Sequence, residues 1–568
     1  MTQTEQQLRP VDAIAEQYVA DYCALDPITA TYLGVKGHDS ELPDLSPAGF
    51  AARERVTADA LAAARAATPV DERERTAQAA FVERLGLAVE QAEAGVSRCD
   101  LSVISSPVHE LRQVFDLMDT DSAEAWAAVA ARLAGIGGAL RDLRVTYADE
   151  AAQGNVVAAR QYAEVATQIE GWTAATGSGP DVFTTIVAPA VADESLPADL
   201  REQLTRAAGD ARRAFADFGL FLSDEMEPQG RAKEAVGREA YALASRTFLG
   251  ARIDFDETYA WGWAELARIE DDMLATGRRI LPGAGSIAEV VAHLDADPSR
   301  QIEGAEAFRE WMQALADKTL AEMDGVHFDI PDQIRRIECM IAPTHDGGIY
   351  YTGPSENFTR PGRMWWEVPE GVTTFSPWRE VTTVFHEGVP GHHLQVGQTT
   401  VRSELLNRWQ RLMCWVSGHG EGWALYSERL MDELGYLADP ADRLGMLDAQ
   451  SFRAARVIVD LGMHLELEIP PNPWDFHVGE TWTPELGLEF MRAHVRMDDA
   501  FIQFEVKRYL GWPGQAPSYK VGERIWLEAR EEARARHGED FDLKAFHRAA
   551  LDLGSIGLDP LADALRRL

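Results

Sequence analysis

The chain has 568 residues, of which 46% are hydrophobic and 26% charged, so it is long enough for a large core and too apolar for a disordered protein. Its 92 acidic residues outnumber its 54 basic residues and give a net charge of −38. Because nucleic acids and anionic membranes are held by clustered Lys and Arg, and the sequence contains no such cluster, we expect neither as a partner.

The sequence carries no sign of an oxidising compartment or of membrane insertion. The four cysteines are far apart, form no Cys-x-x-Cys pair and are expected to be reduced. The N-terminal residues lack a basic stretch followed by an apolar one, and no apolar run approaches the roughly 18 residues that span a bilayer. These features predict a cytoplasmic protein, and nothing in them predicts an oligomeric state.

The first half of the chain is predicted to be helical. Hydrophobic residues recur at helical spacing from Asp12 to Leu25, and Asp26-Pro27 ends that segment. Ser46-Pro47, a pair typical of a helix start, opens a long Ala-rich helix. Nothing in these helices demands chemistry, so we interpret them as scaffold. Further amphipathic helices are expected at roughly residues 76–95, 122–150, 155–175, 198–217 and 255–276.

The character of the sequence changes after about residue 325. Residues 334–341 (IRRIECMI) are β-like, and the Gly-, Pro- and aromatic-rich residues that follow, up to Gly371, fit a strand or hairpin. Helices are expected to resume at Ser376-Pro377 and, after the irregular residues 468–482, at Thr483-Pro484. We predict a mainly α fold with an N-terminal helical lobe (1–280) and a catalytic helical lobe (281–568), interleaved as one unit.

The motif His386-Glu387-Gly-Val-Pro-Gly-His392-His393 is the strongest chemical signal. Zinc peptidases of the His-Glu-x-x-His type bind zinc through two histidines one helical turn apart and use the glutamate as general base. Here the position four residues after His386 is Pro390, which cannot bind a metal. Packing histidines at a kinked helix are the alternative, and this is how we interpret the other His-Glu pair of the chain, at residues 109–110.

Pro390 and Gly391 offer a way to close the motif. In an undisturbed helix His393 would lie two turns, about 10 Å, from His386, which is too far for one shared ion. Proline disrupts a helix and glycine permits unusual dihedral angles, so the intervening residues can bulge and bring a histidine back. If His392 ends such an expanded motif, it is the second ligand and His393 contacts the substrate or supports the site. The residues alone leave the choice between the two open.

A third ligand is expected from another helix. Glu421 follows the Gly-rich residues 417–420 and is predicted to begin a helix, and Glu428, seven residues later, shares its face. Carboxylates on a largely apolar helix face need a partner, and a cation is a natural one. We predict Glu421 as the metal ligand and Glu428 as a residue that orients a ligand histidine. Solvated acids on a surface helix are the alternative.

Two later segments offer candidates for contacts with a substrate. Polar residues recur every three to four positions in residues 453–464 and can line one helix face toward a cleft, although a buried salt-bridge network explains them almost as well. Residues 507–520 combine hydrogen-bond donors with a Gly/Pro turn. A donor to a developing oxyanion is expected from Tyr509, Tyr519 or His464. Substrate contacts or supporting roles are expected for Arg456, Asp460 and Lys520.

Several sequence blocks together resemble the family catalogued as domain of unknown function 885, over nearly the whole chain. They are DPITATYLGVKGHD (26–39), HEGVPGHHLQ (386–395), EGWALYSE (421–428), RVIVDLGMH (456–464) and PGQAPSYKVG (513–522). The arrangement is also similar to that of the helical gluzincins, which include carboxypeptidase Taq and angiotensin-converting enzyme.

The gluzincin resemblance implies a large multi-helix fold with a deep central cleft. It implies that residues 334–343 and 348–353, which include Tyr350, form a small β-hairpin or edge strand beside the substrate. It also implies zinc bound by His386, His392 and Glu421, with Glu387 as the general base.

We therefore predict one Zn²⁺ per chain and hydrolysis of amide bonds, as by a peptidase acting on short peptides. Two rival functions remain open at this point. A metal-dependent hydrolase of a non-peptide amide would use the same residues, and a non-catalytic helical binding protein would hold no metal.

Overall fold

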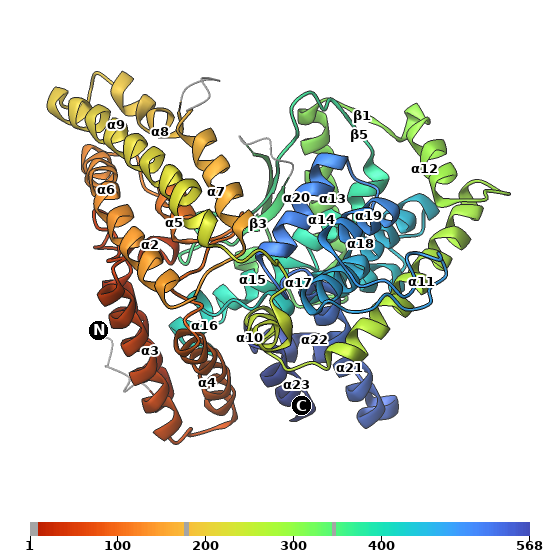
Figure 1. Cartoon of the computed structure of the whole chain (residues 1–568). Helices are drawn as coiled ribbons and strands as arrows, with labels where there is room; N and C mark the ends of the chain where they lie inside the picture. The colour runs from red at the N-terminus through yellow and green to blue at the C-terminus, as the bar shows by residue number, and fades with distance from the viewer. Residues whose placement is uncertain (1–8, 175–180, 343–347, 568) are drawn as a thin grey trace. The chain divides into compact units, whose positions relative to one another are not determined.

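The computed structural model describes residues 9–174, 181–342 and 348–567. Residues 1–8, on which part of the signal-peptide prediction rests, and residues 343–347 of the Gly-rich segment lie outside the described residues. Within these ranges the chain forms 23 α-helices and two small sheets (Figure 1), which confirms the prediction of a mainly α fold. No helix in the described ranges has both the length and the apolar character needed to cross a bilayer.

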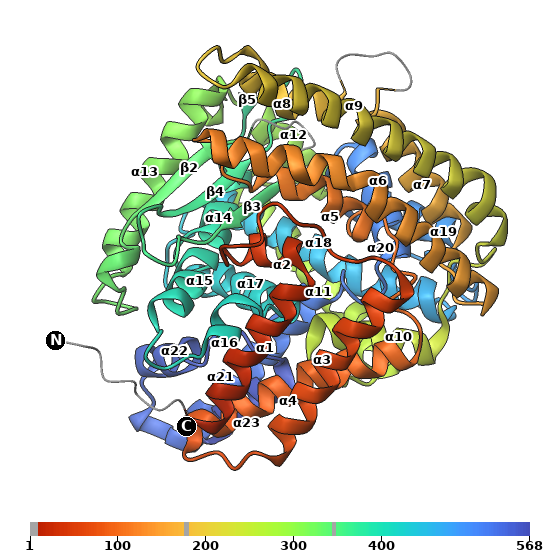
Figure 2. The ribbon, with the colours of Figure 1, turned by 90° about the vertical axis from the view of Figure 1, so that its left-hand side faces the viewer.

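The chain forms two compact units, Met1–Val236 with Leu510–Trp512 and Gly237–Tyr509 with Pro513–Leu568. The predicted division into lobes at residue 280 and the deep cleft stay predictions. In the first unit, α6 and α9 run side by side and enclose a core that includes Leu133, Phe215 and Phe218 (Figures 1 and 2). The helices of this unit are α1 (Pro10–Leu25), α2 (Pro27–Tyr32), α3 (Pro47–Ala66), α4 (Glu72–Glu93), α5 (Pro107–Gln113), α6 (Ala123–Ala152), α7 (Ala159–Trp172), α8 (Val182–Ala192) and α9 (Ala198–Phe221), with the short turns η1 (Val114–Asp116), η2 (Leu222–Met226) and η3 (Glu227–Gln229).

The second unit contains every residue to which the sequence analysis assigns chemistry. In it, α11 packs against α18, α17 against α21, and α14 against both α17 and α18. Its helices are α10 (Gly237–Leu249), α11 (Phe255–Ile280), α12 (Ile287–Asp295), α13 (Ala305–Met323), α14 (Pro377–Glu387), α15 (His392–Val401), α16 (Arg408–Leu412), α17 (Ser417–Glu433), α18 (Pro440–Leu465), α19 (Pro484–His494), α20 (Asp499–Gly511), α21 (Ser518–His537), α22 (Leu543–Leu551) and α23 (Leu558–Arg567), with η4 (Pro298–Arg300), η5 (Asp332–Ile334) and η6 (Gly538–Asp540).

The two sheets lie in the second unit. In the three-stranded sheet, β4 (Gly362–Trp366) is central, with β2 (Ile337–Ile341) parallel to it and β3 (Ile349–Thr352) antiparallel. In the other sheet, β1 (Ile302–Glu303) pairs antiparallel with β5 (Thr374–Phe375). Helix α13 packs against β2 (Figure 2) and buries Phe308 and Met312 there. The strand predicted at 334–341 is therefore present over Ile337–Ile341, and β3 and β4 form the predicted hairpin after it.

The helix starts predicted from Ser-Pro and Thr-Pro pairs are confirmed, but two segments differ from expectation. Asp26-Pro27 ends α1 and at once starts α2, because the Asp26 carboxylate accepts a hydrogen bond from the Thr29 N–H. Helix α17 begins at Ser417 rather than at Glu421, so its glycines are helical. A Cβ on Gly422 would lie 2.5 Å from the carbonyl carbon of Gly522 in α21, so the glycine permits a close helix crossing rather than a turn.

This crossing gives a first testable prediction. Gly422→Ala should lower the free energy of unfolding by roughly 1–3 kcal/mol, because the added methyl group meets backbone that cannot yield. Gly209→Ala in the middle of α9 is the control, since its Cβ would have only an ordinary contact at 3.6 Å, and it should be neutral or stabilising. Urea unfolding measures both, and equal effects of the two substitutions would contradict the close crossing.

Candidate metal centre

The His-Glu motif lies where α14 ends, and the chain bulges before the next helix. His386 and Glu387 are the last residues of α14, and α15 begins at His392. Between them, the Gly391 N–H donates to the carbonyl of Phe385 at 3.1 Å. A Cβ on Gly391 would lie 1.9 Å from the carbonyl oxygen of His386, so a side chain cannot be placed there without moving the backbone. The interruption of the helix is therefore the bulge that Pro390 and Gly391 predict.

Trp423 ties this bulge to α17. The indole Nε1–H of this fully buried side chain donates to the carbonyl oxygen of Pro390 at 2.8 Å. Trp423 lies two residues after Glu421 on the same helix. One indole thus fixes the bulge relative to the helix that carries the predicted third ligand.

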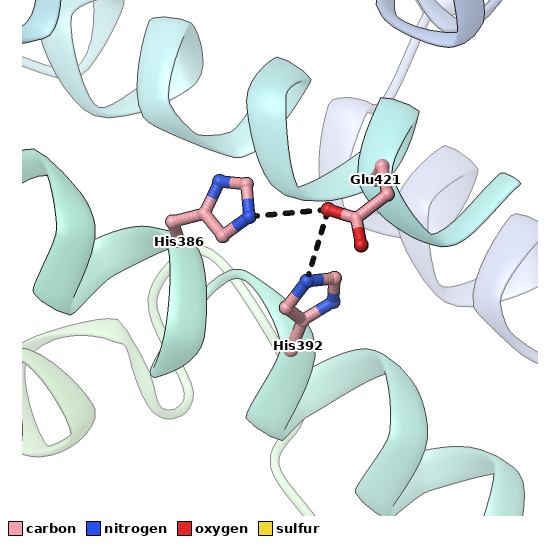
Figure 3. Close-up of side chains that lie close together, drawn as sticks. All are labelled: His386, His392 and Glu421. Carbon is pink, nitrogen blue, oxygen red and sulfur yellow. Dashed lines mark ion pairs between the residues drawn. The ribbon is translucent and has the colours of Figure 1, made fainter. Parts of the chain in front are cut away.

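The bulge brings His392, rather than His393, next to His386 and Glu421 (Figure 3). Oε2 of Glu421 lies 3.3 Å from Nε2 of His386 and 3.4 Å from Nε2 of His392. The two imidazole rings stand at 90° to each other with their centres 4.9 Å apart. Both histidines are buried, and the Glu421 side chain is 18% exposed. Ligand atoms from three different helices therefore converge on one point.

These separations fit a tetrahedral zinc ion. Two ligand atoms that each lie 2.0–2.1 Å from zinc at a tetrahedral angle are about 3.3–3.4 Å apart. Two imidazoles and one carboxylate are also a donor set used by catalytic zinc sites, which keep a fourth position for water or substrate. Among the described residues, no fourth His, Cys, Asp or Glu joins the group.

Glu428 contacts His386 at Nδ1, the ring nitrogen that does not face Glu421. Its Oε1 accepts a hydrogen bond from Nδ1 of His386 at 2.7 Å, and its Oε2 accepts one from the Thr382 hydroxyl at 2.6 Å. Because a carboxylate only accepts, the proton of the neutral imidazole stays on Nδ1 and Nε2 is left to bind a metal. The predicted role of Glu428 therefore agrees with its contacts. Carboxylates in this position orient the ring and raise its basicity.

The surroundings of His386 favour its protonated, positively charged form. Burial lowers the pKa of His386, but its hydrogen bonds to Glu421 and Glu428 outweigh this effect and raise the pKa to about 10. Burial likewise raises the pKa of Glu421, yet the charges and hydrogen bonds of the two histidines hold it well below its usual range. The site is therefore built to hold positive charge.

Glu387 lies beside the three ligands without joining them. It is buried, and its Oε2 has no hydrogen-bond partner among the described residues. Burial raises the pKa of this carboxyl group, which His392 and His386 oppose. A buried carboxylate oxygen without a partner is costly in a folded protein and commonly marks a site that acts on a ligand or water.

His393 is held away from the ligand position. Its Nε2–H donates to the carbonyl of Ile334 at 2.7 Å, and its Nδ1 accepts from the Tyr351 hydroxyl at 2.9 Å. Burial lowers its pKa to about 4, so the ring stays neutral. Tyr351, which the sequence analysis missed, also lies with its ring centre 6.5 Å from that of His392. Tyr350, the predicted contact, stacks on Trp365, because successive strand residues face opposite ways. That alternation is the signal that could have identified Tyr351.

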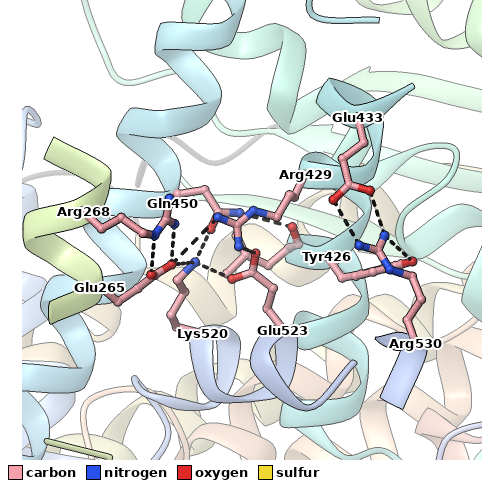
Figure 4. A network of polar contacts seen from close by, with 10 residues as sticks. Glu265, Arg268, Tyr426, Arg429, Glu433, Gln450, Lys520, Glu523 and Arg530 are labelled. Carbon is pink, nitrogen blue, oxygen red and sulfur yellow. Dashed lines mark hydrogen bonds and ion pairs between the residues drawn. The ribbon is translucent and has the colours of Figure 1, made fainter. Parts of the chain in front are cut away.

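Most of the other predicted substrate contacts lie in buried polar networks. Arg456 pairs with Glu505 at 2.6 Å, and the Tyr509 hydroxyl donates to the same carboxylate. Asp460 accepts hydrogen bonds from the Tyr241 hydroxyl and the Gly514 N–H, and His464 bonds the carbonyl of Tyr509. Lys520 pairs with Glu523 and Glu265 in a network that also reaches Arg429 (Figure 4). These side chains connect α18, α20 and α21, and none is among the converging ligands.

Tyr519 differs from these residues. It is half-buried, and its ring lies under the guanidinium groups of Arg453 and Arg456, at 6.0 and 4.9 Å. Its hydroxyl makes no hydrogen bond in the described part of the chain. Of the three predicted oxyanion donors, Tyr519 is the one whose polar group is available to a ligand.

Comparison with known proteins shows which family the chain belongs to. Residues 27–565 match the model of a family described as "Bacterial protein of unknown function (DUF885)". The chain belongs to this family. A search of curated proteins found no match.

Two solved structures share the fold. One is titled "The crystal structure of the putative lipoprotein from Colwellia psychrerythraea"; it has a TM-score of 0.83 and 22% identity, and the match covers 98% of each chain. The other is titled a "putative lipoprotein of unknown function from Shewanella oneidensis"; it has a TM-score of 0.74 and 17% identity, and the match covers 97% of this chain and 99% of that one. At these identities the similarity shows the fold alone.

The contact between His386 and Glu428 gives a second prediction. Glu428→Gln should weaken zinc affinity by roughly 10- to 100-fold, because the amide no longer fixes and polarises the imidazole. Competition with a chromophoric chelator measures this. Glu523→Gln removes an equally buried carboxylate from the Lys520 network, so it should destabilise the fold but leave zinc affinity nearly unchanged. A similar loss of zinc affinity in both variants would contradict a specific role of Glu428.

The charge state of His386 gives a third prediction. Since its pKa is about 10 without metal, zinc binding at pH 7 should release about one proton per ion, and affinity should fall as pH falls. Calorimetry in buffers with different ionisation enthalpies counts the protons. Zinc binding without proton release would contradict the protonated, metal-free state.

Proposed function

We propose that the protein is a zinc-dependent hydrolase of amide bonds that acts on short peptides. The observation that carries the proposal is the convergence of His386, His392 and Glu421 next to Glu387, whose buried Oε2 lacks a partner. Zinc in such a site supplies a Lewis acid that lowers the pKa of a coordinated water toward 7. The three ligands and their surroundings fit that ion in number, donor type and spacing.

Glu387 provides the general base of the proposed reaction. Burial shifts the pKa of this carboxyl group upward, toward neutral pH. A carboxylate with such a pKa can accept a proton from the attacking water and later return one to the leaving amine. Tyr519 can donate its free hydroxyl to an oxyanion that forms on the substrate carbonyl. Glu428 and Trp423 take no part in proton transfer, and they hold His386 and the bulge in place.

Glu387→Gln tests the function directly, because it keeps the shape of the side chain and removes the base. We expect hydrolysis of a mixed peptide library, followed by mass spectrometry, to fall by roughly 10²- to 10⁴-fold while zinc stays bound. Glu110→Gln is the control, since it changes the other His-Glu pair, where His109 bonds Ser106 and Gln168 as a packing residue. Unchanged hydrolysis in Glu387→Gln would contradict the mechanism.

The location of the protein is a separate question. The sequence predicts a cytoplasmic protein, whereas the descriptions of the two solved relatives as lipoproteins support a location in the cell envelope. Fractionation of cells that express the complete gene, with detection of the chain in each fraction, distinguishes the two.

A further inference from the structure

The second unit contains a pocket that none of the three candidate metal ligands lines. It has a volume of about 200 Å³ and lies between the residues that follow α13, the end of α17 and the start of α22. Sites for drug-sized ligands measure roughly 300–1,000 Å³, so this pocket fits a smaller compound. Much of its wall is apolar and comprises Phe328, Leu430, Leu434 and Leu543.

His547 of α22 also lines the pocket and keeps an unused hydrogen-bond donor there. Arg530 donates to the hydroxyl oxygen of the buried Tyr426 at 3.2 Å (Figure 4). That hydroxyl has no other acceptor among the described residues, so it donates its proton to Nε2 of His547, 2.7 Å away. Burial lowers the pKa of His547 to about 3, so the ring is neutral and its own proton lies on Nδ1. No described residue accepts a hydrogen bond from this Nδ1–H, although the side chain is 1% exposed, and a ligand in the pocket can do so.

The charged groups of the pocket favour an uncharged ligand. The Lys544 ammonium group pairs with Asp329 at 2.7 Å and donates to the carbonyl of Gly325 at 2.8 Å, so its charge is already compensated. Asp542 also lines the pocket, and its negative charge disfavours an anion. A neutral carbonyl group can accept from the His547 N–H without a counter-ion, while an apolar body fills the space beside the leucines.

Two side chains of this pocket pack against the residue that holds the bulge of the candidate metal centre. The ring of Phe328 stacks on that of His547, with the ring centres 5.2 Å apart. Both rings also meet Trp423 nearly at right angles, with centre distances of 6.4 and 5.6 Å. Trp423 in turn donates to the carbonyl of Pro390. A single indole therefore contacts the pocket wall on one side and the bulge on the other.

We propose that this pocket is a regulatory site that binds a small uncharged compound with an apolar body and a carbonyl group. The compound accepts a hydrogen bond from His547 and restrains Phe328 and His547 against Trp423. Because a restrained Trp423 keeps its hydrogen bond to Pro390, zinc binding at the candidate metal centre becomes tighter. The ligand site is independent of the proposed hydrolase function, whereas its coupling rests on the candidate metal centre.

Direct binding tests the pocket without relying on catalysis or on zinc. The probes are phenylacetamide and 3-methylbutanamide, each beside its carboxylate, phenylacetate and 3-methylbutanoate. Saturation-transfer NMR titrations of the full chain give the dissociation constants. At least one amide should bind with a dissociation constant of about a millimolar or below, and roughly 10-fold more tightly than its carboxylate.

Three substitutions locate this binding. Leu434→Trp fills the pocket and should abolish it, whereas Leu220→Trp should leave it unchanged, because it adds the same ring at an exposed leucine of α9 that does not line the pocket. His547→Phe keeps a ring beside Phe328 but removes the donor, so it should weaken amide binding roughly 3- to 10-fold. Thermal unfolding of each variant separates a lost contact from a lost fold.

The coupling is measured on the same protein. A saturating amide should raise zinc affinity roughly 5-fold in competition with a chromophoric chelator, and zinc should raise amide affinity by the same factor, because linkage is reciprocal. Trp423→Phe keeps an aromatic ring in the wall but cannot donate to Pro390. It should bind the amide as the unaltered protein does, while the coupling disappears.

The proposal is overturned if no amide binds, if amides and carboxylates bind equally, or if Leu434→Trp binds them as the unaltered protein does. It is also overturned if a bound amide leaves zinc affinity unchanged, or if Trp423→Phe keeps the full coupling. Peptide hydrolysis is judged separately. Glu387-dependent hydrolysis without an effect of the amides on zinc affinity would keep the hydrolase and discard the regulatory site. Coupled binding of amide and zinc without Glu387-dependent hydrolysis would keep the regulatory site and discard the hydrolase.

Discussion

The candidate metal centre depends on one constraint, which is that possible ligand atoms from three helices lie within 4.8 Å of one another. A continuous helix through residues 386–393 cannot meet it, because neither His392 nor His393 would then share an ion with His386. The bulge meets it, and it exists only because Gly391 can lie against the last carbonyl groups of α14. The Trp423 indole then holds the bulge from the opposite helix.

Helix α17 provides a carboxylate to each of the two ring nitrogens of His386. Glu421 and Glu428, seven residues apart, lie on one face and reach Nε2 and Nδ1 of His386 respectively. The position of α17 is set by its close crossing with α21 at Gly422. Residues far from the ligands in sequence therefore set how precisely the ligands meet. This is the arrangement expected where a buried charge must be held without water.

Much of the fold follows from local sequence signals. Ser46-Pro47 and Thr483-Pro484 start helices because the hydroxyl group caps the first N–H groups and proline needs no donor there. The candidate ligands His386 and Glu421 also follow from residue type and spacing, but the choice of His392 over His393 does not. It depends on the carbonyl of Ile334 and the hydroxyl of Tyr351, which come from other segments and occupy both nitrogens of His393. The partners of Arg456 and Asp460 could likewise not be predicted from the sequence, because Glu505 and Tyr241 are distant from them along the chain.

The central claim is that His386, His392 and Glu421 bind one metal ion and that His393 does not. Elemental analysis of protein purified without chelators and then supplied with zinc tests it most directly, with His392→Ala and His393→Ala beside the wild type. The account predicts about one zinc per chain in the wild type, little in His392→Ala, and zinc retained in any His393→Ala protein that folds. Absence of zinc from the wild type, or its retention in His392→Ala and loss from folded His393→Ala, would contradict the account.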